Sequence, residues 1–100
     1  MEVNITNENF EEEVLKYDGT VIVDFYGTWC MPCKMLAPTL HKVASEQNIK
    51  LALVDIDEND ELTREFRIFS VPTIKIFKNG KEVTTSVGVV SEAKILELIK

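Results

Sequence analysis

Hydrophobic residues in this chain gather in short runs and helical stripes that alternate with polar segments. Residues 21–26 (Val-Ile-Val-Asp-Phe-Tyr) have the β-branched and aromatic composition of a buried strand. The segment after them carries apolar residues at the spacing of one helix face, namely Leu36, Leu40, Val43 and Ala44. Residues 50–56 indicate another buried strand. Strand, helix and strand in this order predict a parallel crossover unit, which we expect to be right-handed.

The N-terminal segment predicts a strand followed by a helix. Val3 and Ile5 alternate with polar residues, which is typical of a short strand. Thr6 or Asn7 can cap a helix whose first turns are rich in glutamate, and negative charge stabilises a helix N-terminus. The buried face of this helix is expected to consist of Phe10, Val14 and Leu15.

In the last third of the chain, the pattern predicts two antiparallel strands. Residues 73–77 and 82–87 are two alternating runs joined through Asn79-Gly80, a pair typical of a tight hairpin turn. Asn59 and Ser91 can each cap a further helix. Their inward-facing residues are expected to be Leu62, Phe66, Ile95, Leu98 and Ile99. The resulting order, βαβαβαββα, predicts an α/β fold with a central mixed sheet of about five strands flanked by four helices.

Composition narrows the class of protein. A length of 100 residues predicts a single domain that covers residues 1–100. The hydrophobic fraction of 45% and the charged fraction of 28% are those of a soluble globular protein. A formal net charge of −6 argues against nucleic-acid binding, because phosphates would be repelled. No apolar stretch approaches the roughly 18 residues that cross a bilayer, and no secretory signal follows Met1, so we expect no membrane association.

Both cysteines of the chain, Cys30 and Cys33, lie between the predicted central strand and the helix that follows it. A structural disulfide that closes so short a loop would contribute only about 2 kcal/mol, against about 3 for a loop of fifteen residues. A zinc site needs about four ligands, and His41 is the only histidine. A reversible dithiol/disulfide pair fits best. Two thiols without other disulfides suit a reducing compartment, so a cytoplasmic location is expected.

The position of the pair also assigns roles to the two thiols. The N-terminus of a helix stabilises an anion, so Cys30 should form a thiolate more readily than a cysteine in a free peptide. We therefore expect Cys30 to attack a substrate disulfide and Cys33 to resolve the mixed disulfide that results.

Further segments accompany the cysteine pair in order: residues 23–26 (VDFY), 29–35 (WCMPCKM), 37–38 (AP), 54–57 (VDID), 71–73 (VPT), 77–80 (FKNG) and 87–88 (VG). With these segments the chain resembles the thioredoxin family over nearly its whole length. The resemblance implies the thioredoxin fold and a general protein-disulfide reductase with no bound cofactor, only the redox-active Cys30–Cys33 disulfide. Two positions depart from the family pattern. Met31 stands where most members have glycine, and Leu53 stands where many have a lysine near a buried acid.

The resemblance also implies partners. These are proteins with disulfides and an NADPH- or ferredoxin-linked thioredoxin reductase, and a monomer is expected. Two other functions stay open. One is a disulfide oxidase or isomerase of higher redox potential, and the other is a redox-independent binding subunit of a larger complex.

Asp24 and Pro72 are the other candidate catalytic residues. Asp24 lies within an apolar strand and is expected to be a buried acid whose pKa is raised, able to take a proton from Cys33. The alternative is an acid at the solvated end of the strand. The resemblance implies that the bond before Pro72 is cis and that this proline packs against the cysteines. Pro38 is expected to kink its helix, and His41 to lie on the outer face of that helix without a catalytic or metal role.

Apolar residues beside the cysteines can form a contact surface. Together with two residues that leave the backbone accessible, they are expected to line a shallow groove for an extended peptide: Trp29, Met31, Pro32, Phe69, Ser70, Val71 and Gly88. Val87, by contrast, is expected to belong to the core. Met31 is predicted to influence the choice of partner, because its flexible apolar side chain lies next to the attacking sulfur.

Overall fold

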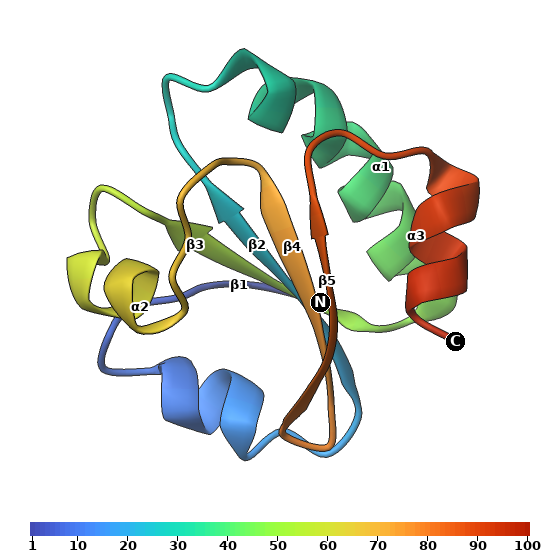
Figure 1. Ribbon diagram of the computed structural model, residues 1–100. Coiled ribbons are helices and arrows are strands. Elements are labelled where there is room, and N and C mark those ends of the chain that lie inside the picture. Colours follow the sequence, from blue (N-terminus) through green and yellow to red (C-terminus); the bar gives the residue numbers. More distant parts are fainter.

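A five-stranded mixed sheet forms the centre of the molecule and carries helices on both faces (Figure 1). The structure is a computed structural model that describes residues 1–100. Its elements are β1 (Glu2–Asn4), η1 (Glu11–Leu15), β2 (Thr20–Tyr26), α1 (Met31–Gln47), β3 (Lys50–Asp55), α2 (Asp60–Glu65), β4 (Thr73–Lys78), β5 (Lys81–Val87) and α3 (Glu92–Leu98). The strand order is β1-β3-β2-β4-β5, with the first three strands parallel and each of the last two antiparallel to its neighbour. The predicted α/β fold and the predicted order of elements are confirmed.

The side chains of β2 alternate between two apolar cores. Val23 belongs to the core under η1 and α2, together with Val14 and Leu62. Ile22 belongs to the core on the other face, together with Leu40 of α1 and residues of α3. Figure 1 shows α1 and α3 on one side of the sheet and α2 on the other. Because both faces are covered, residues 21–25 of β2 are apolar except for Asp24, and each fully buried aliphatic side chain contributes about 1.5–3 kcal/mol.

The turn between β4 and β5 is the tight hairpin that the sequence predicts. Asn79 and Gly80 both have positive φ angles, 52° and 82°, as a type I′ turn requires. A Cβ atom at residue 80 would collide with the carbonyl oxygen of Leu15. Glycine is therefore needed here both for its backbone conformation and for the close approach of the hairpin to η1.

The first helix departs from the prediction at Leu15. The backbone winds as a π-helix, in which the N–H of Lys16 bonds to the carbonyl of Glu11, five residues back. This wider turn moves Leu15 away from the buried stripe, and the residue is 42% exposed. Phe10 and Val14 are buried as predicted.

Of the three predicted helix caps, only that of Ser91 on α3 forms as a side-chain cap of the helix itself, since the N-cap residue of η1 is Phe10, which makes no side-chain capping bond. Thr6 and Asn9 exchange reciprocal side-chain to backbone hydrogen bonds ahead of η1, and Ser91 accepts a backbone N–H of α3. Asn59 precedes α2, but its side chain makes no capping bond. Its amide instead donates to backbone carbonyls at the ends of β1 and β3, at 3.3 and 2.9 Å. The Asn59 side chain therefore ties two strand ends together.

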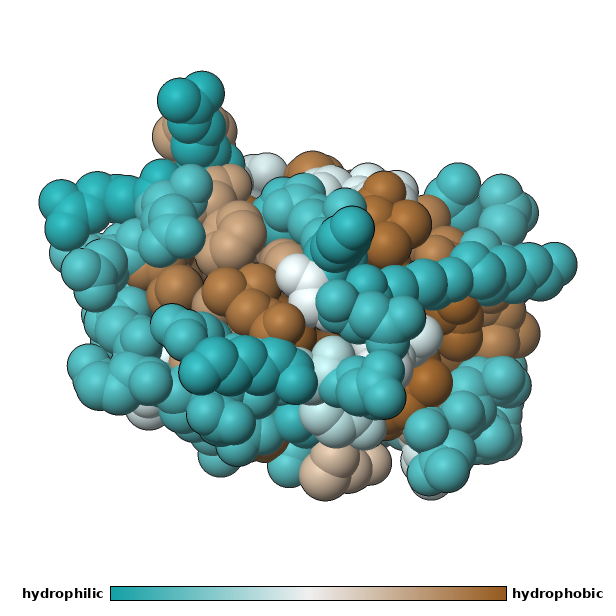
Figure 2. Space-filling view, turned by 90° about the horizontal axis from the view of Figure 1, so that it is seen from below, coloured by the Kyte–Doolittle hydropathy of each residue, from teal (hydrophilic) through white to brown (hydrophobic).

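The surface is mainly polar at the end of the molecule that carries the β4–β5 turn. Figure 2 views this end, where hydrophilic side chains surround separate apolar patches. No helix of the chain combines the length and the apolar character that a membrane span requires. The cysteine pair lies at the opposite end of the sheet, where β2 leads into α1 (Figure 1).

Candidate active site

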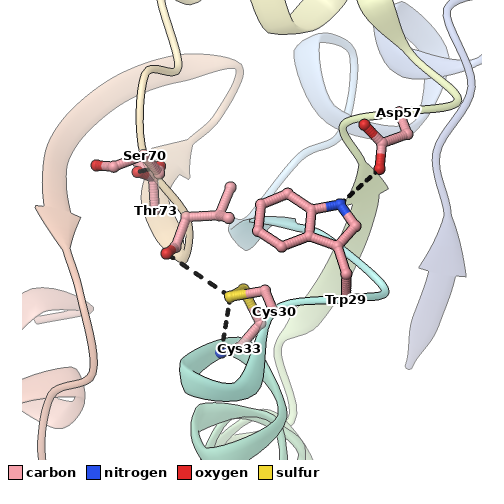
Figure 3. The surroundings of a disulfide bond; sticks show 7 residues. Trp29, Cys30, Cys33, Asp57, Ser70 and Thr73 are labelled. Carbon is pink, nitrogen blue, oxygen red and sulfur yellow. Dashed lines mark hydrogen bonds between the residues drawn. A yellow bond between two sulfur atoms is a disulfide. The ribbon is translucent and has the colours of Figure 1, made fainter.

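Cys30 and Cys33 form a disulfide at the N-terminus of α1 (Figure 3). Cys30 is the N-cap residue, and its sulfur accepts a hydrogen bond of 3.2 Å from the backbone N–H of Cys33. Pro32 suits the first turn, because a backbone N–H there has no partner within the helix. The N-terminus of a helix is a position at which an anion is stabilised, because its free N–H groups and the positive end of its dipole face the charge. The local fold therefore gives the first cysteine the anion-stabilising position.

The loop before β4 packs against Cys30. The Val71–Pro72 bond is cis, as the family resemblance implies, and Pro72 is buried. The carbonyl oxygen of Val71 lies 3.7 Å from the Cys30 sulfur. Within the loop, the Thr73 hydroxyl donates to the carbonyl of Ser70 at 2.7 Å (Figure 3). This bond helps to hold the loop beside the disulfide.

Trp29 is exposed but held in a fixed orientation. Its indole Nε1–H donates to a carboxylate oxygen of Asp57 at 2.7 Å (Figure 3). The ring also lies against Gly27, where a Cβ atom would come within 2.7 Å of it. Sequence analysis did not connect Asp57 with Trp29, because the two residues lie 28 positions apart. Asp57 thus orients a large apolar surface next to Cys30.

Asp24 is buried under α1 and shares a cavity with Cys33. The residue is 4% exposed, and one of its carboxylate oxygens has no hydrogen-bond partner. Burial raises the pKa of Asp24 from 3.8 to about 7, an effect that the charge of His41 partly opposes. The cavity, of about 350 Å³, is lined by Asp24, Tyr26, Gly27, Thr28, Cys33, Lys34, Ala37, His41 and Leu53. The predicted burial and the predicted direction of the pKa shift are confirmed, so Asp24 is not an acid at a solvated strand end.

His41 does not lie purely on the outer face of α1, and that expectation is wrong. The residue is half-buried and lines the same cavity as Asp24. The sequence carried an indication of this, because residues 33, 37 and 41 follow each other at a spacing of four on one helix face. The structure contains no group of three or more His, Cys, Asp or Glu side chains that could hold a metal ion.

Among the residues predicted to form a peptide groove, the three largest side chains are exposed. Trp29 is 63% exposed, Met31 65% and Phe69 91%. Pro32 and Ser70 are also exposed, whereas Val71 and Gly88 are half-buried. The prediction that Val87 belongs to the core is wrong, since it is 61% exposed. It ends β5, an edge strand, and alternation along a strand does not reveal which face a helix covers. Met35, four residues after Met31 on α1, is a further exposed residue that the sequence analysis did not select.

The fold and the cysteine pair together define the class of protein, a thiol-disulfide oxidoreductase. Comparison with known proteins agrees with this class. The thioredoxin family model matches residues 2–100. A thioredoxin from Rickettsia bellii is 42% identical over 99% of this chain and 96% of its own length, and a thioredoxin from Pseudomonas aeruginosa is 40% identical over 93% and 88%. A bifunctional thioredoxin reductase/thioredoxin from Mycobacterium leprae is 43% identical over 94% of this chain, which corresponds to 21% of that longer protein. The chain belongs to the thioredoxin family and is a protein-disulfide reductase.

Proposed function

We propose that Cys30 is the attacking thiol and Cys33 the resolving thiol in this reduction. The Cys30 thiolate forms a bond with one substrate sulfur, and the second substrate sulfur leaves as a thiolate. The Cys33 thiolate then attacks the Cys30 sulfur, which releases the first substrate sulfur and leaves the Cys30–Cys33 disulfide. The substrate gains two electrons and the cysteine pair loses them. The observation that carries this assignment is the N-cap position of Cys30, whose sulfur accepts the Cys33 N–H.

Asp24 is the group that accepts the proton of Cys33 during the resolving step. Both residues line one cavity, which can hold a bridging water. A general base is most effective when its pKa lies near the working pH, and burial brings the pKa of Asp24 to about 7. Pro72 takes no part in proton transfer. It is buried in the loop before β4 and helps to place the Val71 carbonyl next to the attacking sulfur.

An extended peptide segment of the substrate binds in the groove lined by Trp29, Met31, Pro32, Phe69, Ser70, Val71 and Gly88. Three observations support this surface. Its large apolar side chains are exposed, Trp29 is fixed by Asp57, and the backbone N–H of Gly88 is tied to the Pro72 carbonyl at 2.8 Å. An exposed apolar surface next to a reactive sulfur favours protein substrates over small polar disulfides.

The electrons come from a thioredoxin reductase, either NADPH- or ferredoxin-linked. The Mycobacterium leprae relative, whose name combines a thioredoxin reductase with a thioredoxin, supports such a partner. The chain works as a single domain and a monomer in the cytoplasm, where it transfers electrons to oxidised proteins. A coupled assay tests this proposal: with an NADPH-linked thioredoxin reductase and insulin as substrate, the protein should support continuous NADPH oxidation. No turnover with reductases of either kind, although the protein reduces insulin when dithiothreitol is supplied, would contradict the proposed partner.

Met31 provides a prediction about partner choice. It is the first residue of α1, directly after Cys30, and its side chain is exposed. Met31→Gly should change kcat/KM for the thioredoxin reductase by about threefold to tenfold, the effect of losing part of one apolar contact. The rate with oxidised glutathione, which is too small to use the groove, should change less.

A Met31→Ala variant is the control for this experiment, because it removes the side chain without the backbone freedom that glycine adds. Equal effects of Met31→Gly on both partners, or none on either, would show that the methionine has no role in partner choice.

A further inference from the structure

The buried carboxylate of Asp24 lacks a charged partner on the sheet. Its neighbours in register are Leu53 on β3 and Ile74 on β4, and both are apolar. One of its oxygens is buried without a hydrogen bond. Ionising such a group is costly unless an opposite charge lies nearby. The carboxylate form, which the proposed proton transfer requires, must therefore be stabilised from another element.

The only other element in a position to do so is α1, which forms the opposite wall of the cavity. The titratable residues that line the cavity are Asp24 and Tyr26 on β2, and Cys33, Lys34 and His41 on α1, while β3 contributes only Leu53. Lys34 is exposed to solvent, whereas His41 is half-buried. Residues 33 and 41 occupy one face of the helix, two turns apart. The helix that carries the resolving thiol thus also brings an imidazole to the Asp24 cavity.

A second contact holds this imidazole in place. The Nδ1 atom of His41 bonds to a carboxylate oxygen of Glu2 on β1. This contact fixes the orientation of the ring, which also lines the Asp24 cavity. No other ion pair to His41 is present; its neighbour on the helix, Lys42, pairs instead with Glu92.

We propose that His41 is the counter-charge of Asp24 in this protein and, through Asp24, a positioning residue for the resolving step at Cys33. The effect of His41 on Asp24 agrees with this role, because among the cations that line the cavity only His41 lowers the pKa of Asp24. The positioning role of His41 rests on the proposed function of Asp24 as proton acceptor. The role of His41 as counter-charge does not.

The counter-charge is measured directly by ¹³C NMR titration of the Asp24 carboxyl group in the reduced full-length protein. His41→Gln should raise the pKa of Asp24, because a neutral side chain of similar size replaces the cation. His41→Lys, which restores a cation at this position, should bring the pKa back to or below the wild-type value. Lys42→Gln is the matched control, since it removes a charge from the next residue of α1 while leaving the cavity unchanged, and it should have no effect. The same Asp24 pKa in wild type and His41→Gln would overturn the proposal.

The consequence for the reaction is measured by the rate of the resolving step at pH 6. This rate should fall at least about threefold in His41→Gln, since a smaller fraction of Asp24 is ionised, and should recover to within about twofold of wild type in His41→Lys. A raised pKa of Asp24 together with an unchanged resolving rate would overturn the positioning role and the proposed role of Asp24, while the counter-charge itself would stand.

Discussion

Cys33→Ser is expected to trap a stable mixed disulfide with a protein substrate, whereas Cys30→Ser is expected to trap none. In the first variant the attacking thiol remains, so the bond to substrate forms but nothing can displace it. In the second variant the remaining thiol lacks the N-cap position, where the helix N-terminus stabilises an anion. Turnover with insulin should fall to background in both variants, because neither can form the Cys30–Cys33 disulfide. Non-reducing electrophoresis and mass spectrometry of the adducts measure the trapping.

The Cys30→Ser/Cys33→Ser double variant is the control for this experiment. It should form no adduct, and any partner that it still binds identifies a function independent of redox chemistry. Alkylation of the reduced wild type with limiting iodoacetamide at neutral pH gives an independent check. Modification of Cys33 before Cys30 would contradict the assignment of the attacking thiol.

Asp24→Asn is expected to stabilise the protein by up to about 4 kcal/mol at pH 8, and by little below pH 4. Asp24 has a pKa of about 7 in the folded protein, against 3.8 as its ordinary value in an unfolded chain. Between these two values the folded state holds a proton that the unfolded state has released, so the stability of the wild type falls as the pH rises from about 4 to about 7. Converted at about 1.4 kcal/mol per pKa unit, the difference gives the stated magnitude. Asparagine does not ionise, so the variant does not lose this stability as the pH rises.

Urea unfolding of the two proteins between pH 4 and pH 8 measures the effect. Glu58→Gln, an exposed carboxylate at the same end of the sheet, is the matched control and should leave the pH profile unchanged. If the free energy of unfolding changed with pH in the same way for wild type and Asp24→Asn, burial would not disfavour the ionised form of Asp24, and the prediction would be wrong.

The same Asp24→Asn substitution should slow the resolving step by about 100-fold or more, the usual contribution of a general base. The initial attack by Cys30 should change much less, because the acid shares its cavity with Cys33. Stopped-flow measurement of the Trp29 fluorescence can separate the two steps, since this indole lies next to the disulfide. An unaltered resolving rate would remove Asp24 from the mechanism.

The sequence was sufficient to predict those features that depend on local pattern. The run of residues 21–26, apolar on both faces, indicated a central strand covered on both sides, and Asn79-Gly80 indicated the hairpin. The lone Cys-x-x-Cys between a strand and a helix indicated the disulfide, and an acid inside an apolar run indicated the buried Asp24.

Features that depend on the packing of distant elements could not be predicted in this way. The exposure of Val87 follows from its place at the end of an edge strand, and strand order is not a property of the local pattern. The Trp29–Asp57 bond joins the loop before α1 to the loop after β3. For His41 the periodicity was visible, but the packing of α1 against the sheet decides that this face borders the Asp24 cavity.

The reductase function of the cysteine pair is tested most directly by an equilibrium redox titration of the Cys30–Cys33 couple against glutathione. The expected potential is close to the reference value for thioredoxin, about −270 mV. A couple with that potential donates electrons to disulfides whose own reduction potential is higher. A potential of about −180 mV or higher, the range of disulfide isomerases and oxidases, would contradict a reductase and would identify the protein as a catalyst of disulfide formation or rearrangement.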